Sequence, residues 1–137
     1  MIFYFSATGN SAHAAKKIAA VLGENAVSVT ECLKKDFRNF IADKGESIGF
    51  VFPVYNFGLP ITVIDFIDKL NIQTSGNYVF TLATYGGFSG GASKMIKDRL
   101  EEKGIKINAR YSVRMPDTWT PVYDVSDKAK VDETNRK

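Results

Sequence analysis

The hydrophobic pattern of this chain changes repeatedly between the periods of strands and helices. Unbroken apolar runs at residues 1–5, 48–52 and 78–83 predict buried strands, and residues 26–30 predict a shorter one. Unbroken runs are typical of parallel strands, because helices cover both faces of a parallel sheet. We therefore expect these four segments to lie inside one sheet.

Between these runs, apolar residues recur with the period of an α-helix. The pattern predicts helices over residues 11–22 and 92–103 and, more weakly, over residues 31–42. Pro60 suits the first position of a further helix, where its missing N–H costs nothing. The residues expected to face the sheet are Ala15, Ile18, Ala19, Leu22, Val63, Ile64, Ile67, Leu70, Met95, Ile96 and Leu100.

The last regular segment differs from the others. Residues 105–115 alternate strictly between apolar and polar, which predicts a strand with one solvated face near the edge of the sheet. Five strands joined by helices predict an α/β fold, a doubly wound five-stranded parallel sheet of order 2-1-3-4-5 between two layers of helices. We expect residues 1–137 to form a single domain, with residues 124–137 as a polar tail or an incomplete last helix.

Composition limits the functions that need to be considered. The chain has 137 residues, of which 45% are hydrophobic and 24% charged, as is ordinary for one globular domain. No apolar run approaches the ~20 residues of a membrane span, and the start lacks the features of a signal peptide. We therefore expect a cytoplasmic protein that does not contact a membrane. The net charge of +3 comes from scattered basic residues, so nucleic acid is not expected as a partner.

The residues that could carry metal or nucleophilic chemistry are few. One cysteine, Cys32, and one histidine, His13, exclude a cysteine-ligated cluster and disfavour a histidine-based metal site. Cys32 and Arg38 have the C-x5-R spacing of tyrosine phosphatases, but the residues between them are bulky and include no glycine. Residues 86–93 have a P-loop spacing without its lysine. We therefore expect no metal site and no catalytic side chain.

Three segments rich in glycine, hydroxyl or aromatic residues follow the first, third and fourth strands, at residues 6–11, 53–58 and 84–91. Under the predicted strand order they meet at the carboxyl edge, where open α/β sheets bind ligands. The first segment offers hydroxyl groups, an amide and the free N–H groups of a helix start, with no lysine or arginine. It suits the static phosphate of a cofactor, and an ordinary helix-capping turn is the alternative.

The second and third segments combine glycines with aromatic residues. Tyr55, Phe57, Tyr85 and Phe88 all fall where exposure is expected, and exposed apolar surface of this extent marks a binding site. A planar ring stacked between these side chains would account for them, and the glycines would let backbone N–H groups approach such a ring. The alternative is that each aromatic side chain folds back onto the core.

These residues, taken in order, resemble a known family. Residues 4–11 resemble the FMN phosphate loop of the flavodoxin family, and residues 52–60 and 83–91 resemble its two flavin-flanking loops. The resemblance covers residues 1–121 and is closest to flavodoxin-like domains found alone or fused to a two-cluster ferredoxin. It implies FMN as the cofactor, with its phosphate held by Ser6, Thr8, Gly9, Asn10 and Ser11. One side of its ring would be lined by Pro53, Val54, Tyr55 and Phe57, with Gly58 as the place for a backbone change on reduction, and the other side would be reached by Thr84, Tyr85, Gly86 and Gly87.

The resemblance implies an FMN-binding electron carrier, in which the flavin supplies the chemistry and the partners are redox proteins that donate and accept electrons. An FMN-dependent NAD(P)H:acceptor oxidoreductase, with a quinone or similar acceptor, is the alternative, so whether the chain is an enzyme stays open. A non-redox phosphate-binding domain is a third interpretation. Many flavodoxins are strongly acidic, whereas this chain carries a net positive charge, which counts against docking on a basic partner.

Overall fold

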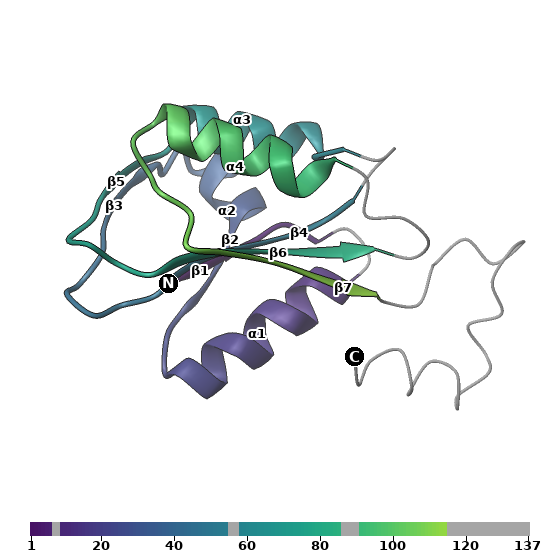
Figure 1. The fold of residues 1–137 in the computed structure, drawn as a ribbon, viewed down its shortest axis with the longest axis horizontal. Helices are drawn as coiled ribbons and strands as arrows, with labels where there is room; N and C mark the ends of the chain where they lie inside the picture. The colour runs from purple at the N-terminus through teal and green to yellow at the C-terminus, as the bar shows by residue number, and fades with distance from the viewer. Residues whose placement is uncertain (7–8, 55–57, 86–90, 115–137) are drawn as a thin grey trace, which may run out of the picture.

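A large parallel sheet forms the centre of the protein. The computed structural model describes residues 1–6, 9–54, 58–85 and 91–114. The sheet has five strands in the order β2-β1-β4-β6-β7 (Figure 1). Counted among themselves, these strands have the order 2-1-3-4-5, so the predicted topology is confirmed. The strands are β1 (Ile2–Tyr4), β2 (Ala26–Ser28), β4 (Ile48–Pro53), β6 (Val79–Tyr85) and β7 (Ala109–Arg114).

Helices lie on both faces of this sheet. α1 (Asn10–Leu22) covers one face, and α2 (Val29–Lys34), α3 (Ile61–Lys69) and α4 (Ala92–Glu102) gather on the other (Figure 1). α1 ends where Gly23 takes a left-handed conformation with φ 69°, so the predicted stop there is confirmed. None of the described helices combines the length and the apolar character that crossing a membrane requires.

A second, two-stranded parallel sheet lies beside the large one. It pairs β3 (Asn39–Ile41) with β5 (Asn71–Gln73) (Figure 1). The helix predicted over residues 31–42 is wrong beyond residue 34, because residues 39–41 form β3. α2 already ends at Lys34, and Asp36 has φ 50°, a conformation that no α-helix contains. The chain is thereby redirected into β3.

The two faces of the large sheet are packed with different side chains. On the three-helix face, the Phe3 ring centroid lies 5.3 Å from that of Phe50 and 5.4 Å from that of Phe66, within a large buried cluster. On the α1 face, the helix presents mostly alanines to the sheet, so its backbone approaches closely. Two inward predictions are wrong, since Leu22 is 46% exposed in the last turn of α1 and Met95 is 38% exposed on α4.

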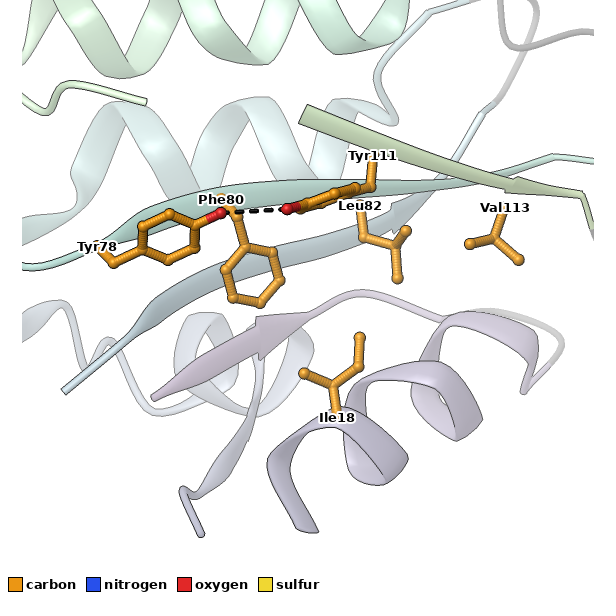
Figure 2. Close-up of a pocket in the computed structure, with 6 residues that line it drawn as sticks. All are labelled: Ile18, Tyr78, Phe80, Leu82, Tyr111 and Val113. Carbon is orange, nitrogen blue, oxygen red and sulfur yellow. Dashed lines mark hydrogen bonds between the residues drawn. The ribbon is translucent and has the colours of Figure 1, made fainter. Parts of the chain in front are cut away.

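Among the described residues, none covers the α1 face out to β7. Beside α1 a hollow of about 330 Å³ opens over β6 and β7, and Figure 2 shows its lining side chains directed into it. The hydroxyl groups of Tyr78 and Tyr111 meet at its rim, 3.2 Å apart. We call this hollow the apolar groove; it is lined by Ile18, Tyr78, Phe80, Leu82, Tyr111 and Val113.

The last strand occupies the sheet edge, as predicted. The alternating apolar residues of this segment, however, do not all lie on one face of the sheet. Ile105 and Ile107 are buried in the cluster of the three-helix face, whereas Val113 packs on the α1 side. Asn108 separates the two parts, because its N–H donates to the Val79 carbonyl and its side-chain oxygen accepts from the Val79 N–H. The strand therefore begins only at residue 109.

Candidate functional site

The three segments singled out in the sequence leave the same edge of the sheet. β1, β4 and β6 are parallel neighbours, and the register pairs Tyr4 with Val51 and Pro53 with Thr84. Their carboxyl ends therefore lie side by side, and the strand order reverses between β1 and β4 (Figure 1). This reversal is the point at which a crevice forms in doubly wound sheets.

The first segment leads into the start of α1. Gly9 is the residue before the helix, with φ 98°, and its N–H donates to the Ser6 hydroxyl oxygen at 3.0 Å. Within the part of the chain that the structure describes, no side-chain cap hydrogen bond is seen at the helix start, and its first turn contains no acidic residue. The N–H groups of a first helical turn lack partners within the helix and carry partial positive charge. This end of α1 therefore suits an anion.

Ser11, the predicted phosphate residue whose hydroxyl lies within this helix, contacts a residue of the sheet. Ser11 is only 1% exposed, and its Oγ lies 2.8 Å from Oγ1 of Thr84, which is 2% exposed. The structure thus joins one residue expected at the phosphate to one expected at the ring. These residues are 73 positions apart, so no local pattern in the sequence indicated their contact.

Thr84 also ties the second segment to the third. Its carbonyl accepts from the Val54 N–H at 3.0 Å, and its hydroxyl lies 3.5 Å from the Phe52 carbonyl. Thr84 and Tyr85 belong to β6, and Pro53 belongs to β4, so both strands extend further than the apolar runs predicted. Backbone pairing with neighbouring strands continues through these residues, which explains the extension.

The described ring-side residues line the same edge. Pro53, Val54, Gly58 and Tyr85 are half-buried, so each keeps some surface at the edge. Other predicted site residues lie outside the described part of the chain, and their placement is untested; they are Thr8, Tyr55, Phe57, Gly86 and Gly87.

The described segments at the ends of β1, β4 and β6 carry no charged side chain, whereas Arg114, which pairs with Tyr85 in the register, ends the neighbouring strand β7. Residues 5–6, 9–12, 53–54, 58–62 and 84–85 contain no aspartate, glutamate, lysine, arginine or histidine. Lys94, in the first turn of α4, is engaged by Asp98 at 2.9 Å. Among the described residues, no group of histidine, cysteine, aspartate or glutamate side chains could hold a metal ion. The edge therefore offers an anion neutral donors and the field of a helix end.

Comparison with known proteins identifies the same architecture. A family model described as a flavodoxin domain matches residues 1–137. No curated protein matches the sequence.

Several solved structures align with the chain. A flavodoxin from the domain Archaea aligns with a TM-score of 0.60 and 16% identity over 98% of this chain and 90% of its own. The Trp repressor binding protein from Bacillus subtilis gives 0.59 and 15% over 99% and 96%. A two-electron reduced flavodoxin from Megasphaera elsdenii gives 0.54 and 23% over 82% and 85%. At these identities the likeness shows a shared fold.

Proposed function

Because this chain belongs to the flavodoxin-domain family, we propose that it binds FMN at the carboxyl edge of its sheet and serves as an electron carrier. Membership of the family implies a flavin cofactor. When bound, FMN supplies the redox chemistry, and the protein binds, orients and shields it. The observation that carries the proposal is that the start of α1, with Gly9 before it, lies at the same edge of the sheet as the uncharged ends of β4 and β6.

The phosphate is proposed to lie against the start of α1. Backbone N–H groups at a helix N-terminus form a ready anion site. Ser6 accepts from the Gly9 N–H, which leaves its own hydroxyl proton free to be donated. Asn10 begins the helix, and Thr8 is assigned to the same role on sequence alone. A site of neutral donors suits a phosphate that is held rather than transferred, since transfer calls for cations to take up charge.

The ring is proposed to lie between the second and third segments. Pro53, Val54 and Gly58 would line one side, and Thr84 and Tyr85 the other. Support comes from the Val54–Thr84 backbone bond, which holds the two segments together at their start. Tyr55, Phe57, Gly86 and Gly87 are assigned to the ring on sequence alone.

An electron carrier needs no acid, base or nucleophile of its own. Residues 5–6, 9–12, 53–54, 58–62 and 84–85 include no aspartate, glutamate, histidine, lysine or cysteine, which supports a carrier over a reductase that moves protons. Redox proteins are the proposed partners, docking where the ring edge is reached. Ile61, at the start of α3, is 84% exposed beside the second segment and offers such a partner an apolar contact.

The visible spectrum of the purified protein tests the cofactor. We expect a yellow protein that releases a ligand with the mass of FMN, and an apoprotein that regains the spectrum on titration with FMN. Gly9→Ala serves as the matched variant. The space around Gly9 is open, but its φ of 98° strains any other residue, so FMN should bind more weakly. Protein that stays colourless after reconstitution contradicts the proposal.

Rapid mixing with NADPH separates the carrier from the reductase. A carrier receives its electrons from a protein, so the flavin absorbance should persist after mixing with NADPH. A reduced redox protein or a chemical reductant should bleach it and thereby serves as the positive control. Rapid bleaching by NADPH itself would assign the chain to the oxidoreductases.

A further inference from the structure

We propose that the redox partner of this protein docks over the carboxyl edge of the sheet with an acidic surface, and that Lys16 and Lys17 of α1 attract it. This inference rests on the proposed function and adds to it the charge of the partner. The placement of charged side chains over the molecule carries it, because the three segments of the proposed site contain no charged residue themselves.

The four described helices all begin at the carboxyl edge. Each of them follows directly on a strand, so its first turn lies at the end of the sheet where that strand stops (Figure 1). A helix start carries partial positive charge. The backbone alone therefore gives this edge a positive field, and charged side chains near it add to that field or cancel it.

Acidic side chains do not cancel the field. In the described part of the chain, the acidic residues in the first turn or the middle of a helix each pair with a lysine of the same helix: Glu31 with Lys34 at 3.7 Å, Asp65 with Lys69 at 3.4 Å and Asp98 with Lys94 at 2.9 Å. The other described acidic residues lie toward the opposite, amino edge, in the last turns of helices or ahead of strands; they are Glu24, Asp36, Asp43, Glu46, Asp68, Glu101 and Glu102.

α1 differs from the other helices because it is basic and contains no acidic residue. Lys16 and Lys17 are exposed in its second turn, and neither forms a salt bridge within the described ranges. Six residues separate Lys16 from Asn10, which is about 9 Å along the helix axis. Because helical side chains leave the backbone toward the start of their helix, both lysines extend toward the carboxyl edge. Arg114, at the end of β7, adds a further cation there.

This distribution of charge fits an acidic partner. Attraction between opposite charges raises association rates by about 10–10³-fold at low salt, and a basic partner would be repelled by the same field. The screening length is about 30 Å at 0.01 M salt and about 3 Å at 1 M, so the two lysines act on an approaching protein only in dilute salt. Ile61, which is 84% exposed at the start of α3, offers an apolar contact at the same edge.

The test measures electron transfer between the holoprotein and two redox proteins of opposite charge, by rapid mixing at increasing ionic strength. A reduced plant-type ferredoxin is the acidic donor to the oxidised flavin. Cytochrome c is the basic acceptor, mixed with the chemically reduced holoprotein. Between about 0.01 M and 0.5 M salt, we expect the second-order rate constant with ferredoxin to fall about tenfold and that with cytochrome c to rise.

Charge reversal tests the two lysines directly. The pair Lys16→Glu and Lys17→Glu should lower the ferredoxin rate constant about tenfold in dilute salt and leave it nearly unchanged in concentrated salt. The pair Lys16→Gln and Lys17→Gln removes the charges without reversing them and should give a smaller loss. The pair Lys44→Glu and Lys106→Glu is the matched control, because both lysines are exposed at the amino edge and the change in net charge is the same. It should change the rate constant less than about twofold.

These results separate the inference from the proposed function. A ferredoxin reaction that is absent, or whose rate constant stays constant or rises with salt, contradicts an acidic partner. Equal losses in the two Glu pairs mean that net charge, and not α1, governs the encounter, and the inference is then wrong. A loss confined to the α1 pair supports it, and if that pair retains less FMN, the Gln pair decides by the same comparison. Wild-type protein that binds no FMN overturns the proposed function, whereas every result above is obtained with the flavin bound.

Discussion

The two faces of the large sheet are packed with side chains of different sizes. The three-helix face buries large side chains, with phenylalanine rings from β1, β4 and α3 in contact. The α1 face relies on alanines, and beside the helix the described residues line the apolar groove without filling it (Figure 2). Stability should therefore be concentrated on the three-helix face, while the α1 face supplies the helix start that the proposed site needs.

The largest expected effect is a cavity on the three-helix face. Phe66 is 1% exposed and its ring packs against Phe3. Phe66→Ala should lower the free energy of unfolding by about 3–5 kcal/mol, because the transfer and cavity penalties add. Tyr111→Ala, which removes a half-exposed aromatic side chain from the groove, should cost less than about 1.5 kcal/mol. Urea denaturation measures both, and equal losses would remove the contrast between the faces.

The next effect tests whether the α1 face depends on close approach. Gly49 pairs with Phe80 across β4 and β6, and a Cβ on Gly49 would lie 2.4 Å from the end of the Phe80 ring. Gly49→Ala should therefore cost about 1–3 kcal/mol through overpacking. Adding Phe80→Leu removes the colliding ring atoms, so the double variant should lose less than the two single losses added together. Strict additivity would mean that the two residues do not compete for space.

A third effect concerns the edge of the large sheet at the amino ends of its strands, which belongs to neither helix-covered face. The Met1 ammonium contacts Glu24 at 2.9 Å and Glu46 at 2.7 Å. Burial opposes ionisation of Glu46, but hydrogen bonds from the ammonium and from the Asp43 N–H outweigh it and lower its pKa. A lowered folded-state pKa adds stability above the unfolded pKa, and this stability is lost as pH falls through the folded value.

Glu46→Gln should accordingly cost about 1–2 kcal/mol near neutral pH. The difference from wild type should shrink as the pH is lowered and vanish once the carboxyl is protonated in both states. Denaturation at a series of pH values measures this, and a difference that stays constant into acid would show that the charge does not carry the effect. Glu31→Gln, in an exposed pair with Lys34 at 3.7 Å, is the control and should change little.

How much of the fold can be predicted depends on how far apart in the sequence the interacting residues lie. The unbroken apolar runs predict the order of the large sheet, because burial on both faces leaves its mark on each strand separately. β3 and β5 escape prediction, since they are three residues long and held by backbone pairing, with a side-chain bond from Asn71 to Asn39. The change of face at Asn108 is not predicted either. The apolar–polar alternation continues past it, although Ile107 packs on the three-helix face and Val113 on the α1 face.

The candidate site likewise has one part that the sequence predicts and one part that it does not. A glycine before a helix, within a run of small hydroxyl residues, predicts the left-handed turn at Gly9. The placement of Ser11 could not be predicted, because its hydroxyl partner Thr84 is 73 residues away and comes into reach only when α1 lies against β6. Local chemistry therefore indicates where an anion fits, whereas a contact such as that between Ser11 and Thr84 forms only in the tertiary structure.

The smallest expected effect lies at the rim of the groove. The hydrogen bond between the Tyr78 and Tyr111 hydroxyl groups raises the pKa of the Tyr78 phenol, with some help from desolvation. Tyr111→Phe removes that bond, so the pKa of Tyr78 should fall toward its ordinary value, as ultraviolet titration of tyrosinate would show against a Tyr78→Phe reference. The bond favours the neutral phenol, so whatever it adds to stability is present below the unfolded pKa and lost as pH rises through the folded one. An unchanged Tyr78 titration would mean that the two hydroxyl groups do not hold their hydrogen bond in solution.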